Sequence, residues 1–207
     1  MEQIFNELKQ RISKIDTSNL ILSSANSDGR VNSTLDEEII FNFLHQFIPE
    51  LEYAPQSRYW YDCIYKGYPF NIKVTTGNSA DNMSSKQGFM YALTGKTYSE
   101  LPGYGNLNNF VPFNTALVQN VQPNNKDYGF IVFFKKSKTI FVSSLKKIEI
   151  AVPNGNNLPL QIRWNSNTKF TKRSQIEQIN YLMNIYIQAW HKKIAGLEPL
   201  DNWSELK

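Results

Sequence analysis

The sequence predicts an α/β or α+β fold in which helices cover a mixed β-sheet. Amphipathic helical patterns open and close the chain, at 3–15 and 175–194. Aromatic and β-branched runs flank Lys66-Gly67, and two further runs of this type occupy 128–134 and 139–145. The order helix, hairpin, helix, strand, strand, helix follows from these patterns.

Length and composition indicate one domain over residues 1–207, because a chain of 207 residues buries a full core. Hydrophobic residues make up 41% and charged residues 19%, as in globular proteins. No stretch approaches about 18 uninterrupted apolar residues, and the acidic N-terminus lacks the apolar core of a signal peptide. The single cysteine, Cys63, excludes an internal disulfide, so we expect a cytoplasmic protein without a membrane segment.

Two helices are expected before residue 50. The first, over 3–15, has its apolar residues at helical spacing. A loop is expected over 18–33, and a capping box from Thr34 to Glu37 then starts a helix that runs to Phe47. In this interpretation Glu37 caps the helix.

The stretch 59–76, YWYDCIYKGYPFNIKVTT, reads as a β-hairpin turning at Lys66-Gly67, and Pro69 favours a delayed second strand. Side chains two apart share one face of a strand, so Asn71 and Lys73 emerge together. Asp62 lies beside them on the other arm. A carboxylate, a second oxygen ligand and an ammonium suit a hard divalent metal and a water that attacks a phosphate.

The elements after the hairpin follow from caps and periodicity. Ser84 or Ser85 caps a helix over 86–93 that stops near Gly95, and 96–125 is expected to be irregular because Gly, Pro and Asn are frequent there. Two strands, a third strand at 160–164 and the closing helix complete the chain.

This order resembles the PD-(D/E)XK nucleases, and most closely a small type II restriction endonuclease. The resemblance covers about residues 34–145: an acidic helix, Asp62 on one strand, Asn71-Ile72-Lys73 on the next, then a helix and a core strand. It implies a restriction-endonuclease-like mixed central sheet flanked by helices. It also implies that Asp62 binds the metal and that Lys73 positions or activates the attacking water.

The chain departs from that family where Asn71 fills the position usually held by Asp or Glu. A neutral amide removes one negative charge from the metal site, which weakens Mg²⁺ binding and argues against two metals. Glu38 on the preceding helix is the preferred compensating acid, and Asp81 is another. Gln87, four residues before Tyr91 on one helix face, resembles the Q-x-x-x-Y element of related exonucleases.

Positive charge is concentrated after residue 125. Residues 1–125 carry 9 Lys and Arg against 12 Asp and Glu, whereas the remainder carries 13 against 6. A basic segment over 146–207, with the turn before it, suits contact with a polyanion. The expected DNA-binding residues are Lys135, Lys136, Lys138, Arg163, Lys169, Lys172 and Arg173.

The resemblance therefore implies a Mg²⁺-dependent endonuclease, with Mn²⁺ as a substitute, that cuts double-stranded DNA at a short palindrome. Such an enzyme acts as a homodimer and has a cognate DNA methyltransferase as its partner. Two alternatives stay open. One is another nuclease of this fold, of repair, phage or structure-specific type, and the other is a catalytically decayed module that only binds nucleic acid.

Overall fold

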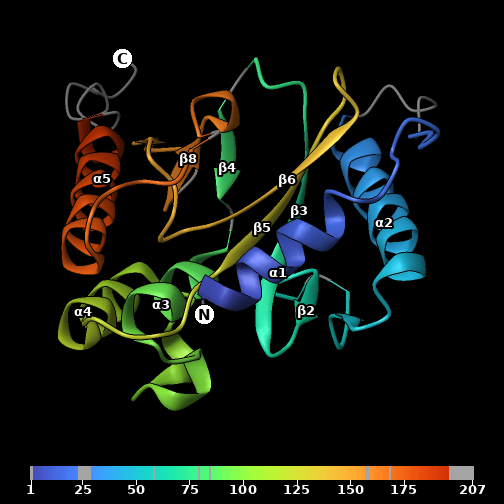
Figure 1. Cartoon of the computed structure of the whole chain (residues 1–207). Helices are drawn as coiled ribbons and strands as arrows, with labels where there is room; N and C mark the ends of the chain where they lie inside the picture. The colour runs from blue at the N-terminus through green and yellow to red at the C-terminus, as the bar shows by residue number, and fades with distance from the viewer. Residues whose placement is uncertain are drawn as a thin grey trace, which may run out of the picture.

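The computed structural model (Figure 1) describes residues 2–22, 29–57, 59–78, 80–83, 85–156, 159–167 and 169–195, with the backbone alone over 29–34. The helices are α1 (Glu2–Ile12), α2 (Gly29–Phe47), α3 (Lys86–Thr94), α4 (Phe110–Asn120) and α5 (Gln175–Ala195). The strands are β1 (Leu51–Tyr53), β2 (Cys63–Tyr65), β3 (Tyr68–Thr75), β4 (Asp81–Met83), β5 (Gly129–Phe134), β6 (Thr139–Ser144), β7 (Ala151–Val152) and β8 (Leu160–Ile162). Short 3₁₀ turns lie at Tyr98–Glu100, Tyr104–Asn106 and Trp164–Ser166.

The expected fold class is confirmed, since helices flank a mixed central sheet. Its strand order is β1-β2-β3-β5-β6, and β3 pairs with β5 in parallel while the other neighbours are antiparallel. A smaller antiparallel sheet has the order β4-β8-β7. Within the described residues, no helix has the length and apolar character needed to cross a membrane.

Two hydrophobic cores lie on the two faces of the central sheet. Phe70 and Ile72 of β3 pack with buried residues of α1 and α2, whereas Phe130 and Val132 of β5 pack with α3, α4 and α5. Figure 1 shows the same division, with α2 on one side of the strands and α3, α4 and α5 on the other. The alternation of side chains along each strand produces it.

The β2–β3 hairpin turns where the sequence predicts. Lys66 and Gly67 both have positive φ, 47° and 79°, as a two-residue type I′ turn requires. The delay expected from Pro69 is wrong, because β3 begins at Tyr68 and Pro69 lies opposite Ile64. Pro69 precedes the stretch that pairs with β5, which starts at Phe70, so its missing N–H interrupts no bond to that strand.

Two helices differ from the sequence prediction. α2 begins at Gly29, so Thr34 and Glu37 lie inside the helix and the expected capping box is wrong. The region 96–125, expected to be irregular, contains α4. Pro112 is the third residue of α4, and the N–H groups of a helix's first turn have no partner within the helix, so proline is tolerated there.

Most of the other elements match their predictions closely, but α1 ends at Ile12 and β2 begins only at Cys63. Ser85 caps α3, its Oγ accepting a hydrogen bond from the N–H of Gly88 at 2.9 Å, and Gly95 ends the helix with φ of 77°. The predicted strands and the closing helix are confirmed as β5, β6, β8 and α5, with ends shifted by one or two residues.

Candidate active site at the fork between β2 and β3

Asp62 and Asn71, two of the predicted site residues, meet where β2 and β3 separate. The two strands pair only from Cys63 opposite Phe70 to the turn, and β3 then continues to Thr75 with β5 beside it. Asp62 lies at the point of separation. Its N–H donates to the carbonyl of Phe70 at 2.9 Å, and its own carbonyl accepts from the N–H of Ala54 at 3.0 Å. Backbone bonds therefore fix Asp62 in the fork.

The carboxylate of Asp62 is held by β3. Its Oδ2 accepts hydrogen bonds from Nδ2 of Asn71 at 2.7 Å and from the N–H of Ile72 at 2.6 Å. Burial raises the pKa of Asp62, while the Ile72 N–H and the charge of Lys73 oppose that rise. A carboxyl group with a raised pKa, placed beside a lysine at a pocket, is typical of functional sites.

Lys73 is oriented by α2. Its Nζ lies 3.6 Å from Oε1 of Glu37, and the side chains are only 18% and 21% exposed. Glu38, the acid preferred from the sequence, lies on the exposed side of α2. Adjacent helix residues point about 100° apart, so Glu37 and Glu38 do not both face Lys73. The capping role expected for Glu37 is wrong, because α2 begins well before it.

Two pockets meet at the Asp62–Asn71 pair. The first, of about 300 Å³, is lined by three acids, Glu37, Glu38 and Asp62, and we call it the acidic pocket. The second, of about 470 Å³, is the amide pocket, and its lining residues are Gln56, Tyr59, Trp60, Asn71, Ser85, Lys86, Gln87, Tyr98 and Asn108. Gln56 and Tyr59 line both pockets and so form their shared wall.

The oxygen donors at the fork are one carboxylate and one neutral amide, the types of ligand that hard divalent cations take. Asn71 uses Nδ2 to bind Asp62, which leaves Oδ1 as its ligand atom beside one carboxylate. Within the described part of the chain, no group of three or more His, Cys, Asp or Glu is arranged to hold a metal. The side-chain oxygens at the fork that could serve as metal ligands belong to Asp62 and Asn71.

Asp81 brings a further acid toward Lys73. It is the first residue of β4, and burial raises its pKa while the Thr75 hydroxyl and the charge of Lys73 lower it. Its Oδ2 is buried and has no hydrogen-bond partner among the described residues. In β4, Asp81 lies opposite Ile162 of β8.

Gln87 and Tyr91 line a common pocket of about 270 Å³, as residues four apart on α3 should. Gln87 also lines the amide pocket together with Asn71, which places it beside the fork. Tyr91 is buried, and burial raises its pKa to about 12, so its hydroxyl stays protonated.

Two of the expected DNA contacts are engaged within the chain near the β5–β6 turn. Nζ of Lys135 lies 2.8 Å from Oδ2 of Asp36, which is fully buried. Nζ of Lys138 donates to the carbonyl of Ser18 at 2.6 Å. The sequence shows that the β5–β6 turn is rich in lysine, but it does not show that Lys135 pairs with the buried carboxylate of Asp36.

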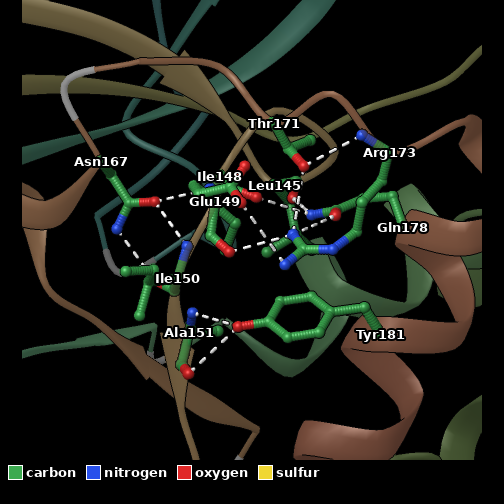
Figure 2. Close-up of polar contacts among 10 residues, drawn as sticks. All are labelled: Leu145, Ile148, Glu149, Ile150, Ala151, Asn167, Thr171, Arg173, Gln178 and Tyr181. Atoms are coloured by element: carbon green, nitrogen blue, oxygen red, sulfur yellow. Dashed lines mark hydrogen bonds and ion pairs between the residues drawn. The ribbon is translucent and has the colours of Figure 1, made fainter.

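Arg173 is likewise engaged, as Figure 2 shows. Its Nη1 donates to the carbonyl of Glu149 at 2.9 Å, to Oγ1 of Thr171 at 3.1 Å and to Oε1 of Gln178 at 3.2 Å. The guanidinium stacks 3.9 Å from the ring centre of Tyr181. The remaining predicted DNA contacts, which are Lys136, Arg163, Lys169 and Lys172, are exposed.

Sequence reasoning missed two residues of the site, Gln56 and Tyr59, and it preferred Glu38 to Glu37. Glu37 was assigned to a cap, while Tyr59 was read as part of a strand, although it precedes β2 and lines both pockets. The run Tyr59-Trp60-Tyr61 was the available signal, because three adjacent aromatics exceed what one short strand can bury.

Comparisons with protein-family models, curated proteins and solved structures find no match to this chain.

Proposed function

We propose that this chain is a metal-dependent nuclease that hydrolyses phosphodiester bonds in double-stranded DNA, acting as a type II restriction endonuclease at a short palindromic site. The observation that carries the proposal is the fork, where Asn71 binds Asp62 and the charge of Lys73 acts on that carboxylate beside the acidic pocket. The order α2, β2, β3, α3, β5 is also the order on which the resemblance to PD-(D/E)XK nucleases rests.

In this proposal each residue at the fork has a separate task. Asp62 and Asn71 hold Mg²⁺, which when bound polarises a phosphoryl oxygen and makes water a stronger acid. Lys73 presents an ammonium to the scissile phosphate and to the attacking water, where it stabilises developing negative charge. Glu37 fixes the direction of Lys73 through their contact at 3.6 Å. A homodimer would supply one such site for each strand.

A second candidate is a module that binds nucleic acid without cutting it. Asn71 favours this reading, because it replaces a carboxylate and its amide already binds Asp62. Such a module would keep the exposed cations that follow residue 125 and lose only hydrolysis.

A digest of plasmid and phage DNA with purified protein in Mg²⁺, Mn²⁺ or EDTA tests the proposal. We expect discrete fragments with either metal and none in EDTA. Lys73→Ala should lower the cleavage rate at least about 100-fold, as loss of a charge-stabilising group at a reacting centre does. Lys14→Ala, an exposed lysine away from the fork, is the matched control and should cut normally.

The digest also separates the alternatives. A smear, or digestion that depends on DNA ends, would favour another nuclease of this type over a restriction enzyme. Retained DNA binding without cleavage in Mg²⁺ or Mn²⁺ would replace the proposal by the binding module.

A further inference from the structure

The amide pocket has an aromatic wall that is held rigidly. The rings of Tyr59 and Tyr61 are 4.7 Å apart, and Trp60 contacts Tyr91 at 5.4 Å and Tyr128 at 6.0 Å. The carbonyl of Trp60 accepts hydrogen bonds from Oγ of Ser85 at 2.8 Å and from the hydroxyl of Tyr128 at 2.7 Å. These bonds tie the backbone of Trp60 to the N-cap of α3 and to Tyr128, which fixes this part of the wall before a ligand binds.

The polar groups of the pocket are mainly neutral amides. Within the described part of the chain, the side-chain amides of Gln56, Gln87 and Asn108 make no hydrogen bond to protein, although all three line the pocket. Among the described residues that line it there is no carboxylate. A side-chain amide offers a donor and an acceptor side by side, the arrangement that pairs with the edge of a nucleobase.

Positive charge lies at the edge of the pocket. Nζ of Lys86, a lining residue, donates a hydrogen bond to the carbonyl of Asn108 at 2.6 Å and sits 4.8 Å from the ring centre of Phe110. Nζ of Lys193 sits 4.2 Å from the same ring. Burial and the charge of Lys193 lower the pKa of Lys86. Two ammonium groups that share one ring repel each other, and an anion beside them relieves that repulsion.

We propose that the amide pocket binds an unstacked nucleobase, with Tyr59 as its stacking partner and Gln87 reading its edge, while Lys86 faces a phosphate of the same strand. An aromatic side chain stacks on the flat face of a base, and inside a duplex the neighbouring base pairs cover that face. The base comes either from a single strand or from a nucleotide flipped out of a duplex. Because Asn71 lines this pocket and binds Asp62, the nucleotide is adjacent to the fork. The inference deepens the proposed nuclease function and rests on it for the identity of the substrate.

The test measures binding in EDTA, where cleavage does not occur, by anisotropy of fluorescein-labelled 16-mers. Three probes are used: a single strand, the matched duplex, and a duplex whose central base faces an abasic position and so leaves the stack easily. Tyr59→Ala and Gln87→Ala are compared with Tyr104→Ala, a 64% exposed tyrosine outside the pocket. Tyr59→Phe keeps the ring and guards against loss of folding as the explanation.

We expect Tyr59→Ala to weaken binding by at least about fivefold, the lower end for loss of one base–aromatic stack. Tyr59→Phe and Tyr104→Ala should bind like the wild type. If Tyr59→Ala binds the single strand more weakly than the wild type does, the bound base comes from single-stranded nucleic acid. If its affinity falls more for the abasic duplex than for the matched duplex, the base is one flipped out of a duplex.

The inference is overturned if Tyr59→Ala and Gln87→Ala bind all three probes as tightly as Tyr104→Ala. It is also overturned if the wild type binds none of them. The proposed function fails separately, in the digest: a wild type that does not cut but loses base binding on Tyr59→Ala keeps the pocket and loses the nuclease.

Discussion

The fork and the cluster around Arg173 are both polar networks, yet they use their groups differently. At the fork, Asp62 gives one carboxylate oxygen to two N–H donors, and its neighbours line two pockets. Around Arg173, the polar side chains form hydrogen bonds within the chain (Figure 2). These bonds join the guanidinium, Gln178 and Asn167 to backbone and side-chain groups.

The difference separates groups that hold the fold from groups that are available to a ligand. Asn167 and Gln178 are each 1% exposed, and between them they bind backbone groups at Leu145, Ile148, Glu149 and Ile150. They join the segment after β6 to α5, and neither is among the described residues that line the acidic or the amide pocket. The fork instead carries a carboxyl group whose burial is unfavourable to its charge. Removing a fork residue should therefore cost activity, and removing a residue of the Arg173 cluster should cost stability.

The largest expected effect is that of Asp62→Asn. Cleavage should fall at least about 100-fold, because the only carboxylate of the proposed metal site is lost. Stability at pH 7 should stay equal or rise, since burial raises the pKa of Asp62 and the ionised form is therefore disfavoured in the folded state. Digestion rates measure the loss of cleavage, and urea unfolding measures the stability. A destabilised variant with normal cleavage would reverse the assignment.

Asp127→Asn tests a buried carboxyl outside both networks. Burial raises the pKa of Asp127 from 3.8 to about 6, against the charge of Lys146. The folded state then binds more protons than the unfolded state, so this group lowers stability as pH rises from about 4 to about 6. The unfolding free energy of the wild type relative to Asp127→Asn should fall by about 3 kcal/mol across that window. Urea unfolding at several pH values measures it, and a pH-independent difference would refute the raised pKa.

Arg173→Ala should lower the unfolding free energy by about 2 kcal/mol, because it strips donors from Gln178 and the Glu149 carbonyl. The adjacent Lys172→Ala is the matched control and should change stability by less than about 0.5 kcal/mol, as exposed positions do. Chemical denaturation compares them. Equal stability of the two variants would return Arg173 to the set of free cations.

Lys172→Ala should instead reduce DNA affinity, with a salt slope smaller by about 1 if Lys172 contacts one phosphate. Binding titrations at several salt concentrations read that slope. An unchanged slope would remove Lys172 from the DNA contacts.

Asn71→Asp gives the smallest change and concerns the metal. Without metal, a second carboxylate beside Asp62 should lower the melting temperature by a few degrees, through repulsion worth about 1 kcal/mol. Mg²⁺ should raise the melting temperature of Asn71→Asp by more than it raises that of the wild type, because the proposed metal site then has a second carboxylate. Thermal melts with and without Mg²⁺ make the comparison, and melts that Mg²⁺ leaves unchanged would count against a cation at this position.

Much of the fold was predictable because it rests on local patterns. The Lys66-Gly67 turn, the cap at Ser85 and the strands β5 and β6 each follow from a few adjacent residues. The start of α2 and the existence of α4 could not be predicted in this way. A capping-box sequence such as that at Thr34 also occurs inside helices, and a proline such as Pro112 is tolerated in the first turn of one.

The site was predictable only along the hairpin. Alternation on β3 placed Asn71 and Lys73 together, and antiparallel pairing brought Asp62 to them. The partners of the cations come from distant segments, as in the pairs Lys73–Glu37 and Lys135–Asp36, and no periodicity encodes such contacts. The choice between Glu37 and Glu38 likewise depended on the rotation of α2 about its axis, which the packing of the core sets.

The fork also bears on the open edge of the central sheet. Beyond Phe70, one side of β3 has no strand beside it within the described sheet, and an open strand edge invites pairing with another chain. The carboxylate of Asp62 occupies the N–H of Ile72 on that edge and places a charge where an incoming strand would dock. The residue proposed to hold the metal therefore also guards the sheet against adding a strand.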